Sequence, residues 1–237
     1  ATGKFKTKSA LQQHISSGAK KVILCVPPVD DQIKMIVAGV NDQMLTPEDC
    51  IISNASCTTN NAAPMLKLIH DAFQIQQAYI TTVHSYTTDQ SLHDQPHKDL
   101  RRARAAGQSI VPTTTGAAKA LTKLFPDLNN VIGGCGIRVP VANGSLCDIT
   151  LNVKKETSIK AVNALFENAA AGPLKGILQF TQDPIVSIDI VGNSHSCVLD
   201  SEMTSVIGKM IKIIGWYDNE TGYSSRIIDL VYKMSRK

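Results

Sequence analysis

Several features are scarce in this sequence, and each scarcity excludes a class of protein. Aromatic residues make up 5% and charged residues 19% of the 237 residues. No apolar run approaches the roughly 18 residues that a membrane-spanning helix requires. The apolar fraction of 43% is ordinary for a globular protein and excludes disorder, collagen, coiled coil and disulfide scaffold. The net charge of +4 is too small to indicate a nucleic-acid partner. We therefore expect a folded chain with a well-buried core.

The cysteines form no recognisable metal or redox motif. Six of them are scattered along the chain without a CxxC pair or zinc spacing, at positions 25, 50, 57, 135, 147 and 197. This scatter favours reduced thiols and a cytoplasmic location, with no metal site. The sequence begins at Ala1, without an initiator Met, and its apolar pattern starts almost at once. We expect a chain that lacks an N-terminal part.

The predicted elements change in character near residue 57. Before it, short apolar runs and a helical pattern are typical of a parallel α/β unit. After it, runs of β-branched residues predict an α+β region with a mostly antiparallel sheet. The strands are expected at residues 20–26, 33–39, 50–53, 76–84, 131–139, 145–153, 185–190 and 209–216. The helices are expected at residues 5–15, 62–73, 116–124, 159–170 and 219–237, the last with Tyr223, Ile227, Leu230, Val231 and Met234 on one face.

Cys57 stands out among the thiols. A predicted strand runs through a short polar turn, SNAS, into Cys57 and a helix. Near a helix N-terminus, the dipole and the free N–H groups favour a thiolate, and a lowered pKa would make the sulfur a nucleophile. The same N–H groups can hold a developing oxyanion. The alternative interpretation is a buried structural thiol.

A nucleophilic thiol needs a base, and His84 is the best placed of the six histidines. It ends a predicted strand directly before a long polar stretch, where active-site residues often lie. A hydrogen-bonded structural histidine remains the alternative. The polar stretch contains the basic segment HKDLRRAR, and loops of this length usually bind a partner or act in function. It has no interleaved aromatic residues, so nucleic acid is disfavoured, while a solvated charged loop remains open.

Five sequence blocks together resemble phosphorylating glyceraldehyde-3-phosphate dehydrogenase. They are SNASCTTN, TTVHSYTTDQ, PTTTGAAKA, RVPVAN and WYDNETGYS, and their order and spacing extend the resemblance over essentially the whole chain. The resemblance implies a dinucleotide-binding domain followed by a catalytic domain, in a subunit that forms homotetramers.

The resemblance also implies a reaction. The family's catalytic cysteine corresponds to Cys57 and its histidine to His84. Cys57 would attack the aldehyde to form a hemithioacetal, and His84 would take the proton as hydride leaves for NAD. Inorganic phosphate would then attack the thioester to give an acyl phosphate. Sulfur suits both steps because it is a good nucleophile and a good leaving group.

Two anion sites follow from the same resemblance. Thr87, Asp89 and Arg138 correspond to the site for the substrate phosphate. The site for inorganic phosphate corresponds to Ser56, Thr58, Thr115 and Gly116, with Arg138 close to both. A backbone N–H at Gly116, which opens a predicted helix, and a planar guanidinium are sound phosphate ligands. Without the resemblance, the threonines would be interpreted as a helix cap and Arg138 as a paired structural charge.

For the cofactor, the resemblance points to the ends of the chain. Asn219 corresponds to the residue that orients the nicotinamide amide, Tyr223 to an aromatic residue beside the ring, and Cys25 to a position near the cofactor. Helix capping and core packing are the alternative roles of Asn219 and Tyr223. The polar loop of residues 86–109 corresponds to a loop at a subunit interface, near the neighbouring subunit's cofactor.

The largest departure from the family is the absence of a G-x-G-x-x-G turn. We therefore interpret residues 1–56 as the remnant of a Rossmann NAD-binding domain, residues 57–218 as the catalytic domain, and residues 219–237 as a helix that packs back on the first part. NAD is expected for the full-length protein, and this chain alone is expected to bind it poorly. The predicted function is oxidation and phosphorylation of glyceraldehyde 3-phosphate in glycolysis or gluconeogenesis. Erythrose-4-phosphate dehydrogenase and a catalytically silent interaction fragment are the alternatives.

Overall fold

A small parallel sheet forms the first part of the computed structural model, which describes residues 4–236. Strand β1 (Val22–Leu24) pairs with β3 (Ile51–Ser53), and β3 pairs with β2 (Lys34–Met35), giving the order β1-β3-β2. Helix α1 (Lys8–Ser16) packs on β1 and β3, and a 3-10 turn, η1 (Asp42–Met44), follows β2. The short apolar runs thus form the parallel α/β unit expected of them, although β2 covers only two residues of the predicted 33–39.

The larger part is built on a seven-stranded sheet with the order β5-β6-β4-β7-β10-β9-β8. Four of its six strand pairs are antiparallel, and β4–β6 and β8–β9 are parallel. The strands are β4 (Ile75–Ser85), β5 (Val111–Thr113), β6 (Ile132–Val139), β7 (Ser145–Val153), β8 (Leu178–Thr181), β9 (Cys197–Ile207) and β10 (Met210–Tyr217). The mixed α/β architecture with a mostly antiparallel sheet agrees with the fold class predicted from the sequence.

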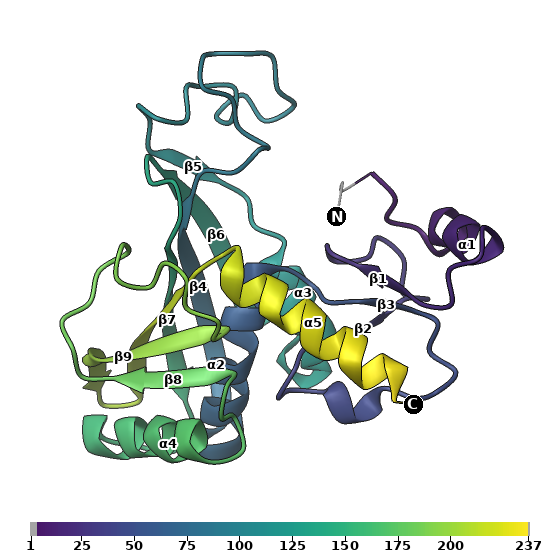
Figure 1. The fold of residues 1–237 in the computed structure, drawn as a ribbon. Helices are drawn as coiled ribbons and strands as arrows, with labels where there is room; N and C mark the ends of the chain where they lie inside the picture. The colour runs from purple at the N-terminus through teal and green to yellow at the C-terminus, as the bar shows by residue number, and fades with distance from the viewer. Residues whose placement is uncertain (1–3, 237) are drawn as a thin grey trace.

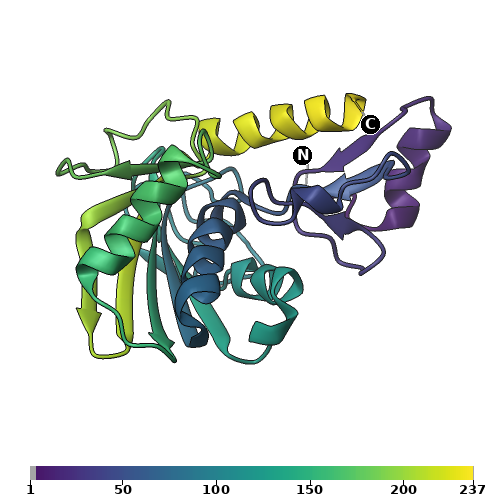
Figure 2. The ribbon, with the colours of Figure 1, turned by 90° about the horizontal axis from the view of Figure 1, so that it is seen from below.

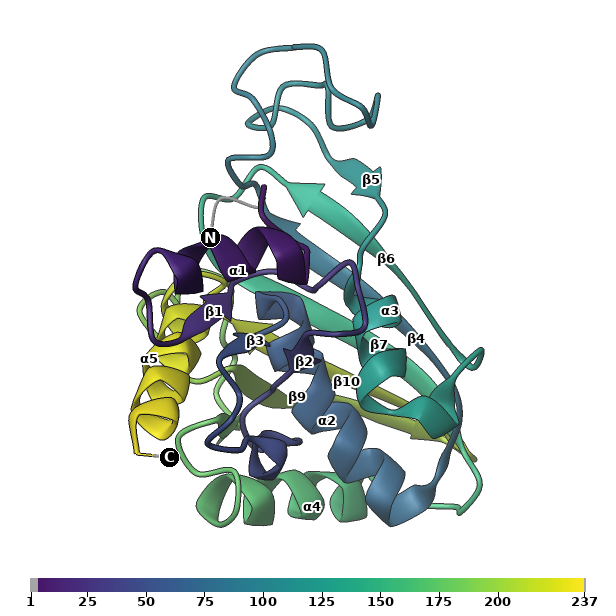
Figure 3. The same cartoon turned by 90° about the vertical axis from the view of Figure 1, so that its right-hand side faces the viewer.

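Three helices cover one face of this sheet, as Figure 3 shows for α2 (Cys57–Phe73), α3 (Ala117–Leu124) and α4 (Ile159–Ala171). Their buried side chains form the main core with the inward residues of the strands, among them Met65, Phe166 and Ile149. A short 3-10 turn, η2 (Pro126–Leu128), follows α3. Helix α2 contains Pro64 and begins five residues earlier than predicted, at Cys57.

The C-terminal helix α5 (Thr221–Ser235) joins the two parts, and Figures 1 and 2 show it extending from the large sheet to the small one. Leu230 and Met234 enter a second core with Ile36, Leu45 and Ile52. An ion pair between Lys233 of α5 and Asp42 of η1 also joins this helix to the first part of the chain.

Two predictions about individual segments are wrong. Residues 185–190 form turns instead of a strand, because Asp189 accepts a hydrogen bond from the Val186 N–H, and Val186 and Ile188 remain 55% and 72% exposed. Val231 is exposed on α5, and the buried face of that helix carries Arg226 in its place. Lys237, expected in the last turn of that helix, lies outside the described residues. Within residues 4–236, no helix is both long and apolar enough to cross a membrane.

Candidate active site

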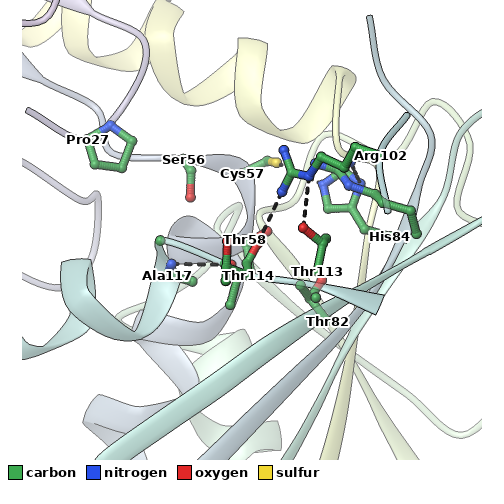
Figure 4. Close-up of a pocket in the computed structure, with 14 residues that line it drawn as sticks. Pro27, Ser56, Cys57, Thr58, Thr82, His84, Arg102, Thr113, Thr114 and Ala117 are labelled. Carbon is green, nitrogen blue, oxygen red and sulfur yellow. Dashed lines mark hydrogen bonds between the residues drawn. The ribbon is translucent and has the colours of Figure 1, made fainter. Parts of the chain in front are cut away.

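A cavity of about 200 Å³ lies where several segments meet, among them β6, which contributes Gly136 and Arg138. The first turn of α2, the carboxyl end of β4, the start of α3 and the polar loop before β5 all contribute side chains to it, as Figure 4 shows. These segments are far apart in the sequence, and the β4–β6 pairing sets His84 directly beside Arg138. The cavity therefore collects hydroxyl, thiol, imidazole and guanidinium groups around one space.

Cys57 is the first residue of α2, and the turn before it is held tightly. Ser56 caps the helix, and its Oγ accepts a hydrogen bond from the Thr59 N–H at 3.1 Å. Ala55 has a φ of 53°, in the left-handed region that a residue with a Cβ seldom adopts. Its carbonyl accepts a hydrogen bond from the Tyr223 hydroxyl at 3.2 Å, which ties α5 to this turn. The thiol therefore has a defined position at a helix N-terminus.

The Cys57 Sγ lies 3.4 Å from the His84 Nε2. His84 is 5% exposed, and its ring packs edge-to-face on Tyr217, with 5.9 Å between ring centroids. Cys57 remains partly exposed and lines the cavity. The sulfur and the imidazole are thus in hydrogen-bond contact at a surface that a small molecule can reach.

Burial sets the ionisation of this pair. It raises the pKa of the Cys57 thiol, although the Thr58 N–H and the charge of Arg138 act in the opposite direction. It also lowers the pKa of His84 to about 4, and the Arg138 charge adds to the lowering. The lowered cysteine pKa predicted from the helix position is therefore wrong for this structure, because loss of hydration outweighs the helix N-terminus. At neutral pH the pair is a neutral thiol beside a neutral imidazole.

The tautomer of His84 depends on the groups at its other ring nitrogen. Nδ1 lies 2.8 Å from the Ser85 carbonyl oxygen and 2.8 Å from Arg138 Nη1, which itself donates to that carbonyl at 2.9 Å. An arginine only donates, so Nδ1 either donates to the carbonyl or accepts from Arg138. Only the first arrangement leaves the Nε2 lone pair facing the sulfur.

Arg102 reaches the cavity from the polar loop and is held by four partners, one of them Asp99, whose carboxylate lies 3.7 Å from its Nε. It donates from Nε to Thr113 Oγ1 at 2.9 Å and from Nη2 to the Thr114 carbonyl at 3.1 Å, and it forms an ion pair with Asp89. Thr113 in turn donates to Asp99 at 2.6 Å. Sequence reasoning had noted the basic segment and assigned it to an interface, without singling out this side chain. The sequence gives only a weak signal for Arg102: a basic residue that precedes the threonine run by about eleven residues. The contact between the two depends on how the loop folds back.

The structure brings seven of the predicted site residues into the cavity wall. They are Ser56, Cys57, Thr58, His84, Thr115, Gly116 and Arg138. Thr87, Asp89, Cys25, Asn219 and Tyr223 are not among the lining residues. Asp89 is linked to the cavity through its ion pair with Arg102. Asn219 is 8% exposed, and its Oδ1 accepts hydrogen bonds from the hydroxyls of Ser85 and Ser145. Lining residues that were not predicted are Pro27, Thr82, Arg102, Thr113, Thr114, Ala117 and Gly136.

A polar cradle lies beside the cavity, at the carboxyl ends of the small parallel sheet. Cys25 follows β1 and interacts with the Tyr223 hydroxyl, and Asn54 follows β3. Asn54 is fully buried, and within residues 4–236 its amide makes no hydrogen bond of good geometry, although the Tyr223 hydroxyl lies close enough to interact with it. Ligands of open parallel sheets bind at this edge, so this amide marks a place for a polar group. In the described part of the chain, no group of three or more His, Cys, Asp or Glu side chains could hold a metal ion.

Comparison with known proteins gives one consistent result. The family model described as glyceraldehyde 3-phosphate dehydrogenase, C-terminal domain, matches residues 56–219. The chain is 50% identical over 231 residues to glyceraldehyde-3-phosphate dehydrogenase of Mycobacterium leprae, which covers 98% of this chain and 68% of the relative. It is 51% identical over 232 residues to glyceraldehyde-3-phosphate dehydrogenase 2 of Streptomyces avermitilis, covering 97% of this chain and 69% of the relative.

Proposed function

Because this chain belongs to the glyceraldehyde 3-phosphate dehydrogenase family, a family of NAD-dependent oxidoreductases, we propose that it oxidises and phosphorylates glyceraldehyde 3-phosphate to 1,3-bisphosphoglycerate. The step would belong to glycolysis or gluconeogenesis. The observation that carries the proposal is the 3.4 Å contact between Cys57 Sγ and His84 Nε2 at a cavity lined with hydroxyls and two guanidinium groups.

Proton transfer starts from the neutral pair. The pKa of His84 near 4 keeps its imidazole unprotonated at neutral pH, so Nε2 can accept the proton of the Cys57 thiol as the sulfur attacks the aldehyde carbon. The raised pKa of the thiol means that the proton leaves during attack. In the tautomer that this step requires, Nδ1 would donate to the Ser85 carbonyl oxygen, which lies 2.8 Å away.

The first turn of α2 stabilises the charge that forms on the substrate oxygen. Backbone N–H groups in the first turn have no partner inside the helix, and the helix dipole favours negative charge there. The N–H groups of Cys57 and Thr58 lie close enough to the sulfur to lower the pKa of its thiol. A hemithioacetal oxygen formed on that sulfur would be within reach of the same donors.

NAD, when bound, would supply the hydride acceptor that turns the hemithioacetal on Cys57 into a thioester. The cradle at the end of the small sheet fits the nicotinamide end of such a cofactor, because Asn54 offers a buried amide without a hydrogen bond of good geometry and Tyr223 a ring beside it. Cys25, Tyr223 and Asn219 would hold that end. The chain has no glycine-rich turn for the pyrophosphate, so these residues hold only part of the cofactor.

Two cationic side chains suit the anionic groups of the reaction. Arg138 lines the cavity from β6 and Arg102 lines it from the polar loop. Thr115 and Gly116 lie at the start of α3. The Thr115 Oγ1 accepts from the Ala117 N–H, which leaves its own proton available for a phosphate oxygen. We assign these groups, with Ser56 and Thr58, to inorganic phosphate, and Arg138 with Thr87 to the substrate phosphate.

Asp89 acts through Arg102 in this scheme. As a carboxylate it would repel a phosphate directly, and in the structure it forms an ion pair with Arg102. Burial acts to raise the pKa of Asp89, but the hydrogen bond and charge of Arg102, together with those of His97, outweigh it, so the pKa is lowered. Asp89 would therefore orient the Arg102 fork toward the cavity.

The polar loop supports a homotetramer. Residues 86–109 project beyond the large sheet in Figure 1, and Leu92 and Leu100 on it are 78% and 81% exposed. Apolar side chains on a projecting loop favour burial against another subunit. The proposed division of the chain remains residues 1–56, 57–218 and 219–237, in a cytoplasmic enzyme.

Steady-state assays of NADH formation test the function. The protein is given glyceraldehyde 3-phosphate or erythrose 4-phosphate, each with and without inorganic phosphate. We expect turnover that requires phosphate and prefers the three-carbon substrate, and that Cys57→Ser abolishes without changing the circular dichroism spectrum. Phosphate-independent turnover of the four-carbon sugar would indicate erythrose-4-phosphate dehydrogenase instead. Absence of both turnover and NAD binding would indicate a silent fragment.

A further inference from the structure

The Asp99 carboxylate lies beside the cavity but is not among its lining residues. Its Oδ2 accepts a hydrogen bond from Thr113 Oγ1 at 2.6 Å, and its Oδ1 accepts one from the Arg101 N–H at 2.9 Å. The hydrogen bond from Thr113 lowers the pKa of Asp99, and the N–H groups of Arg101 and Arg102 and the charge of Arg102 together outweigh the opposing effect of burial. Asp99 is therefore a carboxylate at neutral pH.

The hydrogen bonds that connect Asp99 to Arg102 can run in only one direction. A guanidinium only donates, so Thr113 Oγ1 accepts from Arg102 Nε at 2.9 Å. A carboxylate only accepts, so the single hydroxyl proton of Thr113 goes to Asp99. The Asp99 Oδ2 also lies 3.7 Å from Arg102 Nε, so the opposite charges attract directly. Asp99 thus holds the Thr113 hydroxyl with a lone pair toward the guanidinium.

Arg102 needs this support because a second guanidinium lies near it. Burial and then the charge of Arg102 lower the pKa of Arg138, so the two cations repel each other. Asp89 pairs with Arg102 Nη1, and the Thr114 carbonyl accepts from Nη2. An arginine has five N–H groups, and the contacts in the described part of the chain leave one on each Nη nitrogen for a ligand.

We propose that Asp99 and Thr113 form a positioning pair that holds Arg102 at the cavity before phosphate arrives. The proposal rests on the proposed function, in which Arg102 helps to bind inorganic phosphate. A guanidinium that is already held in place loses less conformational freedom when the anion binds, so the anion binds more tightly. Without Asp99, the Thr113 proton is free to turn toward other acceptors, and repulsion from Arg138 favours an Arg102 side chain that points into solvent.

The effect of removing the Asp99 charge distinguishes positioning from simple electrostatics. A carboxylate near an anion site repels the anion, so Asp99→Asn should tighten phosphate binding if only the charge matters. An amide has one oxygen, so it cannot replace both carboxylate oxygens, which accept from Thr113 and from the Arg101 N–H. The positioning role therefore predicts the opposite sign, with phosphate bound about tenfold more weakly.

Protection of Cys57 against iodoacetamide measures phosphate binding and also works for weak complexes. The labelled site is located by mass spectrometry, and inorganic phosphate is titrated at pH 7 and constant ionic strength. The matched control is Asp94→Asn, which removes the same charge from the same loop. Asp94 likewise accepts from one side chain, Arg104 at 3.1 Å, and from one backbone N–H, that of Ala105 at 2.8 Å. Asp94→Asn should change the dissociation constant less than twofold.

A double-variant cycle tests whether Asp99 acts through Arg102. Arg102→Met removes the guanidinium and leaves Arg138 to bind phosphate, and in that background Asp99→Asn should no longer weaken binding. Thr113→Ser keeps the hydroxyl and should keep the affinity, whereas Thr113→Val should weaken binding. Thermal denaturation of each variant checks that it folds, and the two Thr113 variants carry the test if Asp99→Asn does not fold.

The outcomes separate this proposal from the function on which it rests. Tighter or unchanged phosphate binding in Asp99→Asn refutes the positioning role while the phosphate site stands. Equal weakening by Asp94→Asn, or weakening by Asp99→Asn that persists beside Arg102→Met, refutes it in the same way. If phosphate does not protect Cys57 in the unmodified protein, the phosphate site itself is refuted and the positioning role falls with it.

Discussion

Acidification should destabilise the protein through His84. Burial and the charge of Arg138 lower the pKa of this imidazole to about 4 in the folded chain, compared with about 6.5 in an unfolded one. Between these values the unfolded chain binds a proton that the folded chain does not. The unfolding free energy is therefore largest above pH 6.5 and falls as the pH drops toward 4.

The size of the effect follows from the two pKa values. Each unit corresponds to about 1.36 kcal/mol, so the full difference amounts to roughly 3 kcal/mol. Most of it, roughly 2 kcal/mol, is lost between pH 7 and pH 4.5. Carboxyl groups with lowered pKa values, such as Asp42, lose their contribution mainly below this interval. The change in unfolding free energy between pH 7 and pH 4.5 therefore comes chiefly from histidine.

Urea denaturation of the protein and of His84→Gln at pH 7 and pH 4.5 measures this contribution. The variant lacks the titrating group, so its unfolding free energy should fall by roughly 2 kcal/mol less over the interval. His195, whose pKa is also lowered by burial, is present in both proteins and cancels in the comparison. Equal pH dependence in the two proteins would show that His84 ionises freely in the folded state, and the neutral-base mechanism would be wrong.

Three further predictions concern other parts of the structure. Arg102→Lys keeps the charge but loses the planar fork, so phosphate affinity measured by calorimetry should fall about tenfold; unchanged affinity would remove Arg102 from the site. Lys233→Met breaks the ion pair with Asp42 between α5 and the small sheet and should lower the urea unfolding free energy by about 1–3 kcal/mol, while equal stability would refute that role. Iodoacetamide should label Cys57 well before Cys147, whose pKa burial raises to about 12, and the Cys57 rate should still rise above pH 9; a plateau below pH 8 would contradict its raised pKa.

The long elements and the central pair could be predicted from the sequence because their signals are local. β7 was predicted at its observed bounds, since residues 145–153 alternate strictly between inward and outward side chains. Cys57 and His84 stood out by lying where a strand meets a helix or a loop. β9 was missed because Ser, Asp, Glu and Thr interrupt its apolar pattern, and its stability comes from pairing with β8 and β10.

The resemblance of five sequence blocks to a known family was sufficient to identify that family, and local residue chemistry indicated the helix N-terminus near Cys57 and the hydroxyl-rich segments. Only the packed chain decided how these groups behave. Arg102 becomes a cavity residue because the loop folds back on Thr113, and the thiol pKa rises because burial outweighs the helix N-terminus. The Tyr217 hydroxyl comes within 3.0 Å of Thr58 Oγ1 although 159 residues separate the two in the sequence. Desolvation and the direction of a hydrogen bond depend on every neighbour in space, and the sequence lists neighbours only along the chain.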